Sequence, residues 1–141
     1  MTFTHALRAA PARPAQKQRE TSALNVTQKL VITFACEVLA QDECIRFGQA
    51  GKGNTHAEQY VEAALALLGD GESSIDAFAA LLGHQASCVR RLAAEFLLPH
   101  RREQAALALR QLAAGTGPDA LAAKAKLDRL LVEEPQERYW I

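Results

Sequence analysis

Between residues 75 and 98, apolar residues recur every three or four positions, a spacing that places side chains on one face of an α-helix. The first stripe contains Ile75, Phe78, Leu81 and Leu82. The second contains Val89, Leu92, Ala93, Phe96 and Leu97. We expect Gly83 to end the first helix in a left-handed conformation and Ser87 to cap the second. The pattern therefore predicts two short helices folded back on each other.

The same spacing predicts four more helices, over residues 25–47, 55–69, 100–114 and 118–131. Asn25 with Gln28 and Thr55 with Glu58 have the spacing of capping boxes. Residues 48–53, with three glycines, are expected to form a loose linker. The apolar positions expected to face inward in these helices include Ile32, Phe34, Val38, Leu39, Ile45, Tyr60, Val61, Leu65, Leu67, Ala105, Leu109, Leu112, Leu121, Ala125, Leu127, Leu130 and Leu131.

Helices of about three turns cannot bury their apolar faces alone, so each needs a neighbour. The sequence predicts an all-α domain, a right-handed HEAT-like stack of about six antiparallel helices over residues 23–132. Residues 1–22 are rich in alanine and arginine and contain two prolines, which predicts a flexible basic N-terminal extension. Residues 133–141 are expected to form a C-terminal tail with an aromatic end.

The residues on either side of the turn between the two central helices resemble those of a known type of helical repeat. Leu81-Leu82 before it, and Val89-Arg90 with Ala93-Ala94 after it, resemble a HEAT-type unit. Together with residues 40–43 and Asn54, they make residues 31–131 similar to an uncharacterised bacterial domain-of-unknown-function family of short HEAT-like all-helical proteins. The resemblance implies the helical fold and leaves the activity open.

Charge and cysteine content limit the binding partners and the cellular compartment that we expect for the protein. The 141 residues include 16 basic and 16 acidic side chains, so no global field attracts nucleic acid or an acidic membrane. Residues 23–83 carry an acidic excess and residues 84–110 a basic one. Three cysteines without a C-x-x-C spacing predict reduced thiols, mostly buried, in a cytoplasmic protein. The longest apolar run is too short to cross a bilayer, so no membrane partner is expected.

Basic residues cluster around the junction of the fourth and fifth predicted helices. They form a candidate ridge of Arg90, Arg91, Arg101, Arg102 and Arg110. Such a ridge suits a phosphate backbone or an acidic protein. The alternative is structural pairing, in which Arg90 binds an acidic side chain of the adjoining repeat. We favour pairing, because no aromatic side chains interleave for base stacking.

No motif in the chain assembles a recognisable catalytic or metal site. Glu58 and Glu62 are four residues apart and lie near His56, but neither H-E-x-x-H nor E-x-x-H occurs. Cys88, at a helix start beside two arginines, is a candidate reactive thiolate, although a packing role is favoured. We therefore expect no enzyme activity, no metal and no cofactor.

The last three residues, Tyr139, Trp140 and Ile141, have large apolar side chains whose exposure to water is unfavourable. They either fold back to close the stack or anchor a partner. The leading functional hypothesis is a non-catalytic protein–protein interaction module, namely an adaptor, a regulatory subunit or an immunity-type protein. The alternative is a nucleic-acid-associated helical protein that uses the Arg90–Arg110 ridge.

Overall fold

The computed structural model describes the backbone of residues 12–139 and the side chains of residues 26–133. Within these residues the chain is entirely helical, with six α-helices, one 3-10 helix and no strand. The elements are α2 (Ala12–Arg46), α3 (Ala50–Gly69), α4 (Glu72–Ala79), η1 (Ala80–Gly83), α5 (Ser87–Leu97), α6 (Arg102–Ala113) and α7 (Pro118–Tyr139). The predicted all-α class is confirmed.

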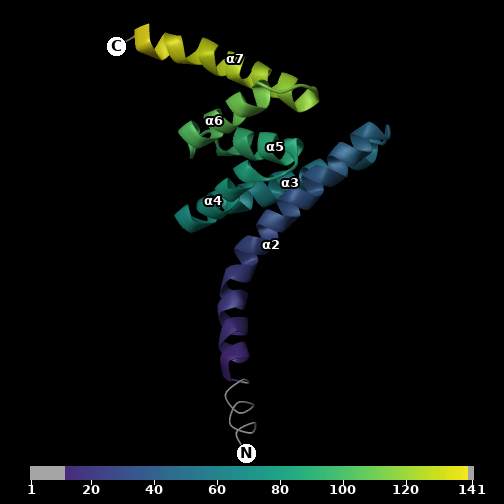
Figure 1. Ribbon diagram of the computed structural model, residues 1–141, viewed down its shortest axis with the longest axis vertical. Coiled ribbons are helices and arrows are strands. Elements are labelled where there is room, and N and C mark those ends of the chain that lie inside the picture. The colour runs from purple at the N-terminus through teal and green to yellow at the C-terminus, as the bar shows by residue number, and fades with distance from the viewer. Residues whose placement is uncertain (1–11, 140–141) are drawn as a thin grey trace, which may run out of the picture.

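The helices are stacked in the order in which they occur in the chain (Figure 1). The long helix α2 forms a hairpin with α3, and α4 with α5 packs against this pair. Helix α6 then packs on α5, and α7 packs on α6 at the far end of the stack. Each middle helix therefore has neighbours on two sides, whereas α7 has them on one.

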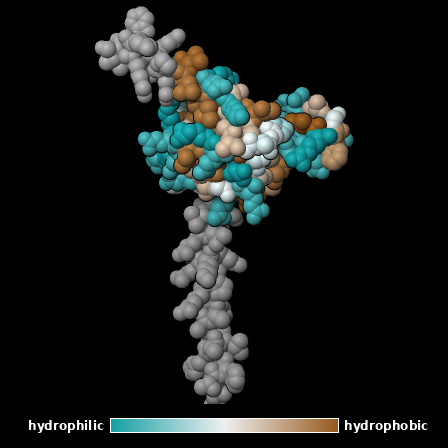
Figure 2. All heavy atoms as spheres, turned by 45° about the horizontal axis from the view of Figure 1, so that its top comes forward, coloured by the Kyte–Doolittle hydropathy of each residue, from teal (hydrophilic) through white to brown (hydrophobic). Residues whose placement is uncertain are grey.

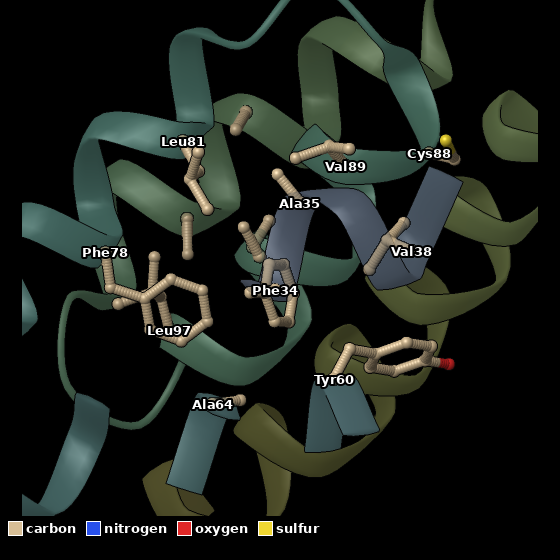
Figure 3. Packing of buried hydrophobic residues seen from close by; sticks show 14 of the residues in the cluster. Phe34, Ala35, Val38, Tyr60, Ala64, Phe78, Leu81, Cys88, Val89 and Leu97 are labelled. Carbon is tan, nitrogen blue, oxygen red and sulfur yellow. The ribbon is translucent and has the colours of Figure 1, made fainter. Parts of the chain in front are cut away.

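An aromatic cluster occupies the centre of the molecule (Figure 3). The ring of Phe34, from α2, lies 4.8 Å from that of Phe78, 5.8 Å from that of Tyr60 and 5.9 Å from that of Phe96, all edge to face. Offset and edge-to-face pairs of this kind are stabilising beyond their buried area. One phenylalanine thus joins α2, α3, α4 and α5.

The two central helices bury the residues that the spacing predicts. Ile75, Phe78 and Leu81 are buried on the first, and Val89, Ala93 and Leu97 on the second. Their other predicted positions, Leu82, Leu92 and Phe96, pack half-buried against the same cluster. The pattern of these two helices is confirmed.

Helix α2 begins well before the predicted capping box at Asn25. It starts at Ala12, so residues 12–22 of the predicted extension are helical, while residues 1–11 lie outside the described residues. Pro14 is compatible with this start, because the first N–H groups of a helix have no intrahelical partner. At the other end of the chain, α7 continues to Tyr139, so most of the predicted tail is helical as well.

The predicted loose linker is wrong, because α3 begins at Ala50 and includes Gly51 and Gly53. The chain turns at Gly48, which has φ +71°. Gly53 is buried against α2, and a Cβ built there would lie 3.6 Å from Cys44 Cβ and Gln41 Cγ. The predicted Thr55 cap is absent, since Gln49 precedes the helix.

Two further local predictions are wrong. Gly83 does not have a positive φ, because the first central helix tightens into the 3-10 turn η1 before the chain becomes extended at His84. Ser87 lies inside α5 and caps no N–H. Its hydroxyl instead donates to Asp119 Oδ2 at 2.7 Å.

Candidate protein-interaction surface

Arg90 closes the turn before α5. Its guanidinium donates to the backbone carbonyls of His84, at 2.6 Å, and Gln85, at 2.8 Å. The Nδ1 atom of His84 accepts the N–H of Ala86 at 3.0 Å. The predicted pairing of Arg90 with a carboxylate is therefore wrong, because the orphan carbonyls of the turn lie closer to its guanidinium.

Arg91 links α5 to α7. Its Nε donates to Asp119 Oδ1 at 2.9 Å and its NH1 donates to Glu95 at 2.8 Å. Burial on its own would lower the pKa of Arg91, but the hydrogen bond to Asp119 and the nearby carboxylate charges raise it overall. Because Ser87 donates to the same carboxylate, Asp119 receives two donors from α5. These contacts fasten α7 to the rest of the stack.

Arg101 links the start of α6 to α4. It donates to Glu72 at 2.6 Å and to Asp76 at 2.9 Å. These hydrogen bonds raise the pKa of Arg101. Because both carboxylates face water, the contact orients the two helices more than it stabilises them.

The arginines predicted to form a ridge are thus distributed over three local arrangements. One is the turn before α5, another joins α5 to α7, and the third joins α4 to α6. Arg102 and Arg110 are exposed on α6. Tyr139 ends α7, and Trp140 and Ile141 lie outside the described residues.

The acidic residues of α2 and α3 form pairs rather than a metal cluster. Glu37 Oε2 lies 2.5 Å from His56 Nδ1 across the two helices, and Asp42 pairs with Arg46 at 2.9 Å. Glu58 and Glu62 are exposed. Among the described residues, no group of three or more metal-ligating side chains occurs.

All three cysteines are free thiols. Cys88 is buried, and its pKa is raised, mainly by burial and then by the charges of Asp42 and Asp119. These surroundings disfavour the activated thiolate considered for Cys88, because burial and nearby negative charge oppose the charged form. Cys44 is also buried, whereas Cys36 is exposed on α2.

Beside Cys88 lies a surface hollow of about 670 Å³, between the end of α2, the turn before α5 and the start of α7. Its carboxylates Asp42 and Asp119 are already paired with arginines. Within the hollow the Ser87 hydroxyl donates to Asp119, but Arg91 binds the same carboxylate, so Asp119 serves as an ion-pair partner.

Exposed apolar side chains lie near the start of α7 and again about three turns further along it. Leu121, Leu131 and Val132 are 68%, 64% and 69% exposed, and Figure 2 shows hydrophobic surface beside the grey C-terminal residues. The side of α7 that faces the stack buries Ala120 and Ala123 instead. The predicted inward positions Leu121, Ala125 and Leu131 are therefore wrong.

A second set of apolar side chains is exposed on the first two helices. The predicted inward positions that face water there are Ile32, Leu39, Ile45, Val61 and Leu65. Helix α2 is covered by α3 on one side and by α4 and α5 on another, so its third side remains open. No described helix is both long and apolar enough to cross a membrane.

The fold recurs in a bacterial protein of known structure. The protein RPA1889 from Rhodopseudomonas palustris CGA009 is similar to this chain with a TM-score of 0.71 and 27% sequence identity. The similarity covers 77% of this chain and 89% of that one. No protein-family model matches the chain, and no significant match to a curated protein is found.

Proposed function

We propose that this chain is a non-catalytic protein-interaction module, a cytoplasmic HEAT-like stack whose last helix, α7, presents the surface that binds a partner protein. Its three free cysteines are consistent with a reducing compartment. The successive helical hairpins, each packed on the one before, are consistent with a HEAT-like stack.

The exposed face of α7 is the observation that supports this proposal best. The end of a helical stack normally has a polar outer surface, because no further repeat covers it. Here Leu121, Leu131 and Val132 are all more than 60% exposed on the last helix. An apolar helix face of this kind suits a partner that adds one more helix or an apolar groove to the stack.

The charge arrangement favours a protein over a nucleic acid as this partner. Arg91 and Arg101 already bind carboxylates of their own chain, and Arg90 binds backbone carbonyls. Arginines that bind within the chain have fewer donors available for phosphates. We also include Tyr139 and Trp140 in the interface, because aromatic side chains commonly anchor protein partners and Tyr139 is the last residue of α7.

The test is site-specific photo-crosslinking in cells of the source organism. A benzoylphenylalanine replaces Leu121 or Val132 on α7, and in a matched control it replaces Leu65, which is 61% exposed on α3. The expected result is one discrete protein adduct from both α7 positions and none from position 65.

A competing substitution on the same helix sharpens this test. Leu131→Gln should remove the adduct formed at position 121, because it takes apolar area out of the interface while glutamine remains a good helix former. An adduct with RNA, or equal labelling from positions 121 and 65, would contradict the proposal.

A further inference from the structure

One stripe of α2 is exposed on the side opposite Phe34, and its last members, Leu39 and Glu43, border the hollow beside α5 and α7. Its members alternate at spacings of three and four residues, which places them on one helical face. They are Lys29, Ile32, Cys36, Leu39 and Glu43. Ile32 is 61% and Leu39 40% exposed, and the Cys36 thiol is free and exposed.

The other sides of α2 are already occupied. Phe34 and Val38 face the core, and Glu37 meets His56 of α3. Gln41 and Cys44 lie against Gly53, also in α3. The stripe is therefore the remaining side of the helix.

The stripe is complementary to itself. Lys29 lies seven residues before Cys36, and Glu43 lies seven residues after it. Neither charged side chain forms an ion pair with a described residue. If a second copy of α2 lies antiparallel across a twofold axis at Cys36, Lys29 of one copy lies beside Glu43 of the partner subunit, and the reverse pair forms as well. The apolar residues of the two stripes then meet between these two charge pairs.

We propose that this stripe is a self-association surface, through which two copies of the chain pair as antiparallel α2 helices with Cys36 at the twofold axis. This pairing goes beyond the proposed binding of a partner on α7. The stripe is about 21 Å long at 1.5 Å per residue. Because so short a helix contact is smaller than a standard interface, the dimer is weak.

Sedimentation velocity of the full chain tests the two charge pairs. Lys29→Glu and Glu43→Lys each place like charges opposite each other twice, so each should weaken the dimer about tenfold, or ~1.4 kcal/mol. The double variant Lys29→Glu/Glu43→Lys should restore the original dissociation constant, because it exchanges the partners. Circular dichroism verifies that all three variants keep the helicity of the folded chain.

Any of three results of that experiment overturns the proposal. One is a chain that sediments as a monomer up to millimolar concentration. The second is a double variant that dimerises as weakly as the single variants. The third is a pair of single variants that dimerise like the unaltered chain.

Disulfide trapping tests the position of the twofold axis. Two helix axes about 10 Å apart leave ~5 Å between facing Cα atoms, within the reach of a disulfide. Diamide should therefore oxidise two Cys36 thiols to one disulfide, taking up two electrons and two protons. Cys36→Ser should abolish the covalent dimer, because Cys44 and Cys88 are buried.

The matched control carries Leu65→Cys in the Cys36→Ser background, which moves the single exposed thiol to α3. It should remain monomeric under diamide. Covalent dimers formed as readily through position 65 as through Cys36 would overturn the assignment of the axis.

Discussion

The two ends of the helical stack are packed with different side chains. Around Phe34, the helices α2, α3, α4 and α5 meet through four aromatic rings. In α6 and α7 many of the buried side chains are small, namely Ala105, Ala108, Ala120 and Ala123. Leu109 and Leu112 of α6 are large and buried, and Leu127 and Leu130 of α7 pack half-buried against the core.

The difference shows where the fold derives its stability. Large rings remove much apolar area from water, whereas alanines allow helix axes to approach closely and bury little area each. The far end is therefore fastened partly by polar contacts, in which Arg91 and Ser87 of α5 both donate to Asp119 of α7. The less strongly packed end is also the one whose outer face exposes Leu121 and Val132.

The largest expected effect is at the aromatic centre. Phe34→Ala should reduce the free energy of unfolding by about 3–5 kcal/mol, because it removes a fully buried ring and leaves a cavity between four helices. Urea unfolding followed by circular dichroism measures this loss. Leu65→Ala, at a position 61% exposed on α3, is the control and should change stability by less than about 0.5 kcal/mol.

A loss of under about 1 kcal/mol for Phe34→Ala would contradict the view that this ring joins the helices. It would mean that Phe78 and Tyr60 close the gap, so that the centre is as adaptable as the end of the stack formed by α6 and α7, here called the alanine end.

The sequence predicts the aromatic centre well and the alanine end poorly, for a physical reason. A phenylalanine or leucine at helical spacing in a middle helix is covered by neighbours on two sides, so Phe34, Phe78 and Leu97 are buried as predicted. In a terminal helix only one side is covered. There the predicted Leu127 and Leu130 pack half-buried against the core, but the buried Ala120 and Ala123 are less hydrophobic than the exposed Leu121, so hydrophobicity alone does not identify the covered side.

Spacing in the sequence also cannot predict the polar contacts of the candidate surface. Arg91 and Asp119 are 28 residues apart, and nothing in the local pattern distinguishes this pair from other charges. Three arginines of the predicted ridge, Arg90, Arg91 and Arg101, lie in three separate local arrangements. Their partners depend on how α4, α5, α6 and α7 lie in space, and only the structure supplies that arrangement.

A smaller effect is expected at the alanine end. Ala123 of α7 is fully buried, and a larger side chain there would force α6 and α7 apart. Ala123→Leu should therefore lower stability by about 1–3 kcal/mol, in the range of overpacked cores. Thermal unfolding by calorimetry measures the change.

Ala125→Leu is the matched control on the same helix, because Ala125 is exposed. It should leave the melting temperature almost unchanged. If Ala123→Leu were stabilising instead, the α6–α7 contact would contain unfilled space, and the contrast between the two ends would be one of packing quality rather than of side-chain size.

The smallest expected effect is at Gly53, where α3 approaches α2 as closely as small residues permit. Its position inside α3 favours alanine by about 0.5–1 kcal/mol, and a Cβ there would meet Cys44 and Gln41 at an ordinary contact distance of 3.6 Å. Gly53→Ala should therefore stabilise the chain slightly in urea unfolding. Gly71→Ala should do the opposite, by about 1–3 kcal/mol, because Gly71 has φ +106°, which other residues adopt only under strain. Destabilisation by Gly53→Ala would show that the α2–α3 contact, like the α6–α7 contact, has no room for one more methyl group.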